Sequence, residues 1–357
     1  MTSVSTSAPI SVPTLPHAPP PALLRSTDAV GPALRAAVAG LHPWPQQMAA
    51  YAFGWCEADG TPSAGGSGGK GVRQALAMLG AEAVGAPASD GITAAVAVEL
   101  VHAFSLVHDD IMDGDERRRH RESVWKAFGT GPAVLAGDAL YALAVGTLAG
   151  AGSAHGAAAV RELSGALGEL VHGQADDLLF ETRPWTGPEA VRTAEYRDMA
   201  VRKTGSLLSC ALSLGPVLAG AAPGQTEALA EAGRQLGTAF QAVDDLLGIW
   251  GDPGITGKPV HSDLLRGKKT LPVLTALASG TEAGHRLAGL LGGGPLRAAE
   301  AAGAARLVEE AGGREAVLAE AHRAVAAARR CLESAPLAPG AVTELGELSA
   351  FLVERRL

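Results

Sequence analysis

The sequence has few aromatic residues and few cysteines, and both shortages exclude classes of protein. Aromatic side chains are 4% of the 357 residues although hydrophobic types reach 47%, so aliphatic side chains must form the core. Segments rich in Ala and Leu with few β-branched runs favour helices, and they predict an all-α fold. The three cysteines, Cys56, Cys210 and Cys331, are too few and too scattered for a disulfide framework or a zinc site, and they favour a reducing cytoplasm.

Excess positive charge is absent as well. The formal net charge is −8, which argues against a nucleic-acid-binding protein. The N-terminus lacks a basic segment followed by an apolar one, so it does not resemble a secretory signal. No apolar run looks long and uninterrupted enough to span a membrane, and we expect none to do so.

The chain divides into a short tail and one large domain. Residues 1–24 are rich in Ser, Thr and Pro, which predicts a disordered tail. Residues 25–357 show helical patterns throughout and no strand pattern, so we expect a single helical domain. The expected helices include 28–39, 45–57, 74–79, 92–113, 133–149, 156–181, 188–214 and 225–250.

The most informative stretch is the acidic end of the helix expected over 92–113. Asp109, Asp110 and Asp113 follow an apolar run without Gly or Pro. Asp109 and Asp113 are four residues apart and so share one helix face. Carboxylates there are costly to bury unpaired, and they suit Mg²⁺ that is also held by substrate phosphates. An acidic patch exposed to solvent is the alternative.

A second acidic pair ends another apolar helix. Asp244 and Asp245 close the helix expected over 225–250 and follow Gln241. Two acidic clusters facing each other can hold several Mg²⁺ ions and, through them, one diphosphate. Apolar helix bodies below would line a cavity, so the pattern suggests a substrate with a diphosphate head and a hydrocarbon tail.

Cations accompany both clusters. Lys70 and Arg73 lie in a Gly-rich segment that leads into a helix N-terminus, a natural anion site, although a flexible linker would look the same. Arginines 117–119 and 121 follow the first cluster, either as diphosphate ligands or as a surface neutralised by neighbouring acids. Lys203 lies in apolar surroundings, where a lysine side chain usually extends to water. Asp176 and Asp177 fit a polar helix face as well as they fit a functional site.

Together these motifs resemble the trans-type isoprenyl diphosphate synthases of the polyprenyl synthetase family. The shared motifs are Gly-Gly-Lys-x-x-Arg, Asp-Asp-x-x-Asp followed by Arg-Arg, Lys-Thr-Gly, Gln-x-x-Asp-Asp and a distal Lys pair. The resemblance implies antiparallel helices around a deep central cavity, and a homodimer. It also implies Mg²⁺-dependent, head-to-tail condensation of isopentenyl diphosphate with an allylic diphosphate.

The resemblance assigns roles to particular positions. The implied metal ligands are Asp109, Asp113 and Asp244, with Asp110 and Asp245 beside them. The implied allylic diphosphate ligands are Arg118, Lys203, Thr204, Gln241, Lys258 and Lys268. The implied isopentenyl diphosphate ligands are Lys70, Arg73, His102 and Arg119. Without the resemblance, His102 would be interpreted as a hydrogen-bonded core histidine.

Three departures from the family pattern stand out. Gly248 stands where the last Asp of the second acidic motif is usual, so that site has one carboxylate fewer. Gly71 and Gln74 stand where Arg and Pro are common, and His120 and Glu122 replace a usual Gly and Pro. None of these changes removes a residue assigned above, so we expect an active enzyme.

Product length in this family depends on what closes the cavity below the first motif. Phe104 and Ser105 lie five and four residues before Asp109. A large residue only at the deeper position suggests a C20 product, geranylgeranyl diphosphate. The alternatives are farnesyl diphosphate synthase, a terpene cyclase on the same fold, and a non-catalytic subunit of a heteromeric synthase.

Overall fold

About 75% of the described chain is helical, as the composition predicts. The computed structural model describes residues 19–63, 71–257 and 259–353. The helices are α1 (Pro21–Ala39), α2 (Pro43–Ala52), α3 (Val72–Ala83), α4 (Ala88–Met112), α5 (Val124–Phe128), α6 (Thr130–Ala149), α7 (Gly156–Thr182), α8 (Thr193–Ala200), α9 (Ser206–Leu218), α10 (Pro223–Trp250), α11 (Pro253–Thr256), α12 (Ser262–Leu265), α13 (Leu271–Leu277), α14 (Glu282–Leu291), α15 (Ala298–Glu310), α16 (Gly313–Glu333) and α17 (Pro339–Val353). A π-helical segment, η1 (Val201–Gly205), joins α8 to α9, and two short strands, β1 (Arg117–Arg118) and β2 (Arg121–Glu122), form an antiparallel hairpin.

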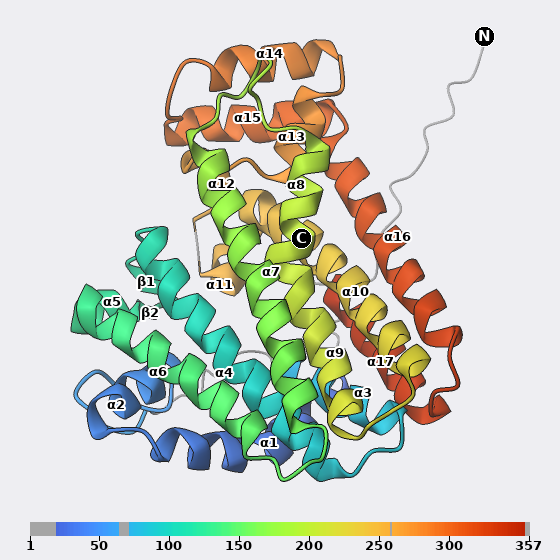
Figure 1. Cartoon of the computed structure of the whole chain (residues 1–357). Coiled ribbons are helices and arrows are strands. Elements are labelled where there is room, and N and C mark those ends of the chain that lie inside the picture. Colours follow the sequence, from blue (N-terminus) through green and yellow to red (C-terminus); the bar gives the residue numbers. More distant parts are fainter. Residues whose placement is uncertain (1–18, 64–70, 258, 354–357) are drawn as a thin grey trace.

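The long helices pack lengthwise around a mostly aliphatic core, which divides into one large cluster and smaller ones beside it. Figure 1 shows α4, α7 and α10 running through the body of the molecule, with α13, α14 and α15 across one end. Helix α9 packs against α3, α4, α7 and α10, and α16 covers the other side of α10. The fully buried large side chains are leucines and one methionine, as the scarcity of aromatic residues predicts.

Glycines let the central helices approach one another closely. A Cβ atom at Gly80 would overlap the backbone carbonyl of Leu212, and one at Gly233 would overlap that of Leu208. These contacts bring α3 and α10 against the backbone of α9, where a larger residue would force the helices apart. Small residues therefore set the spacing of this layer.

Three sequence predictions need correction. The disordered tail predicted over residues 1–24 lies outside the described residues as far as residue 18, and its boundary at residue 24 is too late, because α1 begins at Pro21 and buries Ala22 and Leu23. Proline at the first position of a helix has no N–H to leave unpaired, which suits it to start α1. The continuous helix expected over 188–214 begins at Thr193 and is interrupted by η1. The expectation of no strands missed the hairpin of β1 and β2, which are only two residues each.

The expectation that no segment is apolar enough to span a membrane was also too strong. By length and hydropathy alone α4 and α6 are both sufficient. The apolar window of α4 is 67% buried inside the fold, as in the core helix of a globular protein, whereas that of α6 is 33% buried.

Candidate functional site

The end of α4 faces cations and acids from distant parts of the chain. Asp109 lies within electrostatic range of Lys203 in η1, Asp113 on its own helix and Asp177 on α7. Burial raises the pKa of Asp109 to about 6. The positive charge of Lys203 opposes this rise, and the negative charge of Asp113 adds to it. An ionised Asp109 is therefore unfavourable in the free protein, and any bound cation would relieve it.

Asp113 is held by the segment that precedes α13. Its Oδ2 lies 3.0 Å from Nζ of Lys268, and its backbone carbonyl accepts a 3.0 Å hydrogen bond from Arg266. Burial would raise the pKa of Asp113, but Lys268, Lys203 and Arg266 outweigh it, so the pKa lies below its usual value. Among the described residues, the buried Oδ1 of Asp113 has no hydrogen-bond partner.

Lys203 is paired across to α7. Its Nζ lies 2.5 Å from Oδ2 of Asp177, and Thr204 donates a 2.7 Å hydrogen bond to Oε1 of Gln241 on α10. Gly173 makes the pairing possible, because a Cβ there would overlap the backbone N of Lys203. The neighbouring acid, Asp176, instead pairs with Arg202 at 3.4 Å on the exposed side.

Asp110 points to the other side of α4. Its side chain is 3% exposed and accepts three hydrogen bonds from Arg118, two of 2.9 Å and one of 2.6 Å. This bidentate pairing ties the hairpin to α4. It also occupies the carboxylate, so the geometry argues against Asp110 as a direct metal ligand and gives Arg118 a protein partner.

Asp245 is enclosed as well. It is 2% exposed and accepts hydrogen bonds from the hydroxyl of Tyr196 at 2.8 and 2.7 Å, from Gln241 at 2.9 Å and from the backbone N of Leu271 at 3.0 Å. Burial raises the pKa of Asp245 to about 7 despite these donors. The prediction of Asp245 as a metal ligand therefore does not fit its geometry. Asp244 is exposed at the same end of α10.

A second polar group lies on the α3 side of α4. Arg73 Nη1 is 3.1 Å from Nε2 of His102, and burial together with Arg73 and Arg119 lowers the pKa of His102 well below its usual value. Buried Glu99 faces Arg73 and Arg119, and burial raises its pKa while those cations oppose the rise. Glu99, His102 and Arg119 line the same pocket.

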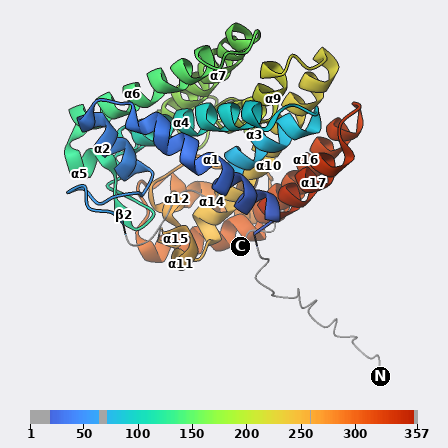
Figure 2. The same ribbon diagram turned by 90° about the horizontal axis from the view of Figure 1, so that it is seen from below.

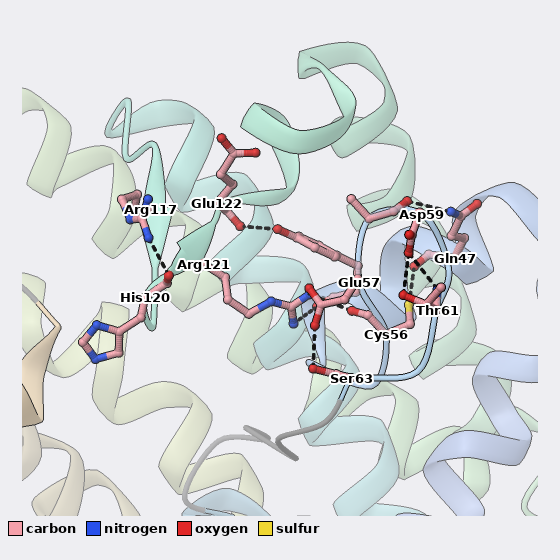
Figure 3. A network of polar contacts seen from close by, with 12 residues as sticks. Gln47, Cys56, Glu57, Asp59, Thr61, Ser63, Arg117, His120, Arg121 and Glu122 are labelled. Atoms are coloured by element: carbon pink, nitrogen blue, oxygen red, sulfur yellow. Dashed lines mark hydrogen bonds and ion pairs between the residues drawn. The ribbon is translucent and has the colours of Figure 1, made fainter.

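The hairpin that carries Arg118 and Arg119 is anchored to the loop after α2 (Figure 3). Arg121 donates a 2.6 Å hydrogen bond to the carbonyl of Cys56, and its guanidinium lies 4.2 Å from the ring centroid of Tyr51. The hydroxyl of Tyr51 donates to the carbonyl of Glu122 at 2.8 Å. His120 adopts a left-handed backbone with φ of 67°, a conformation that glycine adopts at little cost.

The two residues predicted to set product length point to different neighbours. The Phe104 ring centroid lies 4.7 Å from that of His108 and 5.8 Å from that of Tyr141 on α6. Ser105 is buried and donates a 2.9 Å hydrogen bond to the carbonyl of His102. Tyr141 had no sequence signal, because its contact depends on how α4 packs on α6.

The structure thus brings Asp109, Asp113, Lys203 and Lys268 together, and places Arg73, His102 and Arg119 in a second group. Lys70 and Lys258 lie outside the described residues. The described residues contain no cluster of three or more His, Cys, Asp or Glu side chains close enough to hold one metal ion by themselves. Asp177 is the main addition to the predicted site.

Comparisons with known proteins show which family this chain is related to. The family model described as polyprenyl synthetase matches residues 63–308. The chain is 43% identical to a (2E,6E)-farnesyl diphosphate synthase of Mycobacterium tuberculosis over 94% of its own length and 93% of the relative's. It is also 43% identical to a geranylgeranyl diphosphate synthase of the same organism, over 82% of each chain. The crystal structure of a polyprenyl synthetase from Streptomyces coelicolor superposes with a TM-score of 0.87 at 45% identity, covering 93% of this chain and 98% of that one.

Proposed function

This chain belongs to the polyprenyl synthetase family and is an isoprenyl diphosphate synthase, a transferase of prenyl groups. We propose that it joins isopentenyl diphosphate head-to-tail to an allylic diphosphate and makes geranylgeranyl diphosphate. The observation that carries the site assignment is the group of Asp109, Asp113, Lys203 and Lys268, which comes from three separate segments.

The acidic end of α4 suits a hard divalent cation. Asp109 is a carboxylate that burial disfavours in the charged form, and Asp113 keeps a buried oxygen without a hydrogen-bond partner in the described chain. Both observations fit oxygen ligands of Mg²⁺, with Asp244 completing the set from α10. When bound, Mg²⁺ would neutralise charge that develops on the departing diphosphate.

Two groups of side chains would each bind one diphosphate. Lys203 and Lys268, with Lys258, would hold the allylic diphosphate while its bond to the allylic C1 breaks. Arg73, His102 and Arg119 would hold isopentenyl diphosphate so that its alkene carbon faces that C1. His102 is neutral at physiological pH because of its lowered pKa, so it would act as a hydrogen-bonding group. The new carbon–carbon bond forms, and the released diphosphate accepts the proton that is lost.

Product length is the finer part of the proposal, because relatives include synthases of both farnesyl and geranylgeranyl diphosphate. The support for C20 is Phe104 alone. Its ring contacts those of His108 and Tyr141, which would hold it in place as the floor of the cavity.

We also propose a homodimer in the cytoplasm. The exposed apolar side chains include Val134 and Leu135 on α6 and Val171 and Leu179 on α7, and Figure 2 shows these helices along the same edge. A second copy that covers this edge would bury them. Light scattering should give a mass twice that of one chain, and Leu135→Glu should lower this mass toward that of one chain. The free thiols Cys56, Cys210 and Cys331 suit a reducing compartment.

The test is a turnover assay with purified protein, Mg²⁺, isopentenyl diphosphate and each of dimethylallyl, geranyl and farnesyl diphosphate. A C20 diphosphate supports the whole proposal, and a C15 product would refute only the chain length. Hydrocarbon or alcohol formed without isopentenyl diphosphate would indicate a cyclase. No turnover with any primer would indicate a non-catalytic subunit.

A matched pair of variants tests the site assignment itself. Asp177→Asn should lower turnover at least tenfold, because Asp177 positions Lys203. Asp176→Asn is the control on the adjacent residue, whose partner Arg202 is exposed, and it should leave turnover nearly unchanged. Equal effects of the two substitutions would contradict the assignment.

A further inference from the structure

Two adjacent lysines precede α13, and their side chains point to different parts of the molecule. The ammonium of Lys268 lies 3.0 Å from Oδ2 of Asp113, at the acidic end of α4. Lys269 is 8% exposed, and its ammonium lies instead at the C-terminal end of α7. The proposed reaction uses Lys268 and gives Lys269 no role, so the enclosed ammonium of Lys269 has another purpose.

The ammonium of Lys269 has two neighbours at the end of α7. It donates a 3.1 Å hydrogen bond to the carbonyl of Glu181, in the last turn of that helix. The last carbonyls of a helix have no partner within it and carry the negative end of the helix dipole, so a cation is stabilised there. The ammonium also lies 4.5 Å from the ring centroid of Trp185, in the loop after α7, and a tryptophan ring attracts a cation.

These two contacts hold an ammonium that would otherwise extend to solvent, as lysine side chains usually do. Burial lowers the pKa of Lys269, because the charged form loses its hydration, and the negative charge of Glu181 opposes that shift. The charged side chain is therefore kept in this place only by its partners. Its contacts tie the backbone at residue 269 to the end of α7.

Nearby residues tie the same segment to two other helices. The backbone N of Leu271 donates a 3.0 Å hydrogen bond to Oδ2 of Asp245 on α10. The guanidinium of Arg266 donates a 3.0 Å hydrogen bond to the carbonyl of Asp113 on α4. Lys268 lies between these two anchors, and the contact with α7 is made by the residue directly beside it. A long, flexible side chain reaches one place reproducibly only from a backbone that is fixed.

We infer that Lys269 is a positioning residue: its contacts with Glu181 and Trp185 fix the backbone from which Lys268 reaches the allylic diphosphate. This inference rests on the proposed function, because Lys269 acts through a residue of the proposed site. It assigns a purpose to a lysine that faces away from both proposed diphosphate positions.

The experiment removes the ammonium and keeps the apolar part of the side chain. Lys269→Met should weaken the binding of geranyl diphosphate about tenfold, because a small displacement of a positioned group carries a cost of this order. The affinity is measured by calorimetry with Mg²⁺ and without isopentenyl diphosphate. The affinity for isopentenyl diphosphate should stay unchanged, since its proposed ligands lie on α3, α4 and the hairpin. Arg314→Met is the control, because it also removes a cation from a tryptophan ring, that of Trp250 at 5.3 Å, and it should change neither affinity.

A double-mutant cycle distinguishes positioning from a contribution to stability alone. Lys268→Ala should weaken geranyl diphosphate binding by itself. In that background Lys269→Met should cause little further loss, because no ammonium remains to be positioned. A residue that only stabilises the fold would weaken binding by the same factor in both backgrounds, and that result would overturn the inference. Trp185→Leu leaves both lysines in place and should also weaken geranyl diphosphate binding, and it replaces Lys269→Met in the cycle if that variant does not fold.

The outcomes also separate this inference from the proposed function. An original chain that turns over, while Lys269→Met binds geranyl diphosphate equally well, would refute the role of Lys269 alone. An original chain that neither turns over nor binds geranyl diphosphate with Mg²⁺ would refute both.

Discussion

Replacing Asp109 by Asn should stabilise the free protein while it abolishes turnover. Asp109 is mostly buried, and its pKa of about 6 against an ordinary 3.8 means that the folded protein holds the proton more tightly than the unfolded chain does. Stability contributed by the neutral form is complete at low pH and is lost as the pH rises from about 4 to 6. Asn resembles the neutral form at every pH.

The size of the effect follows from the two pKa values. Each pKa unit corresponds to about 1.4 kcal/mol. The rise from 3.8 to about 6 therefore means that ionised Asp109 lowers the free energy of unfolding by about 3 kcal/mol at pH 8, and Asp109→Asn should restore it. At pH 4.5 Asp109 is mostly neutral in the folded protein, so the same substitution should raise the free energy of unfolding by only about 1 kcal/mol. The free energy of unfolding, measured in urea at both pH values without added metal, should show this difference.

Asp113→Asn is the matched control, one turn away on the same helix. Lys268, Lys203 and Arg266 hold its pKa below the usual value, so its ionised form stabilises the fold. This variant should also lose turnover but should unfold more easily at pH 8, and the loss should shrink as the pH falls below about 4. If Asp109→Asn lowered the free energy of unfolding at pH 8, or raised it equally at both pH values, the electrostatic interpretation of the site would be wrong.

Three further substitutions test other parts of the structure. Gly173→Ala should cut turnover by tenfold or more, because the added Cβ overlaps the backbone of Lys203, and an undiminished rate would contradict that contact. Tyr196→Phe should lower the free energy of unfolding by about 1–3 kcal/mol, measured in urea, because Asp245 loses the hydrogen bond that the Tyr196 hydroxyl donates to its carboxylate. Phe104→Ala should give a longer product than the original chain does, measured by chromatography of the released alcohols, and an unchanged product would mean that another side chain closes the cavity.

Local sequence patterns were sufficient to predict the fold class and the ends of the acidic helices. The apolar run before Asp109 predicted α4, and the run before Asp244 predicted α10, because an aliphatic helix that ends in carboxylates must emerge from the core there. The role of Lys203 and its motif came from the family resemblance, and the π-helical turn around them was not predicted. A π turn differs from an α turn in hydrogen bonding and leaves no clear trace in residue periodicity.

The orientation of individual carboxylates could not be predicted. Asp110 and Asp245 stand beside their motif partners in sequence, yet each points away from them into a closed network with Arg118 or Tyr196. Asp177 contributes to the site through Lys203, 26 residues later in the chain. Such contacts depend on how helices pack, which no short motif contains.

The glycine contacts between α3, α9 and α10 have a consequence for how the product of this enzyme can change. Where backbones touch, as at Gly80 and Gly233, any substitution moves whole helices, and stability limits which changes survive. Phe104 and Tyr141 meet through side chains, which can be exchanged without moving a helix axis. New product lengths should therefore arise by exchanges along the contact between α4 and α6, while the layer of α3, α9 and α10 stays constant.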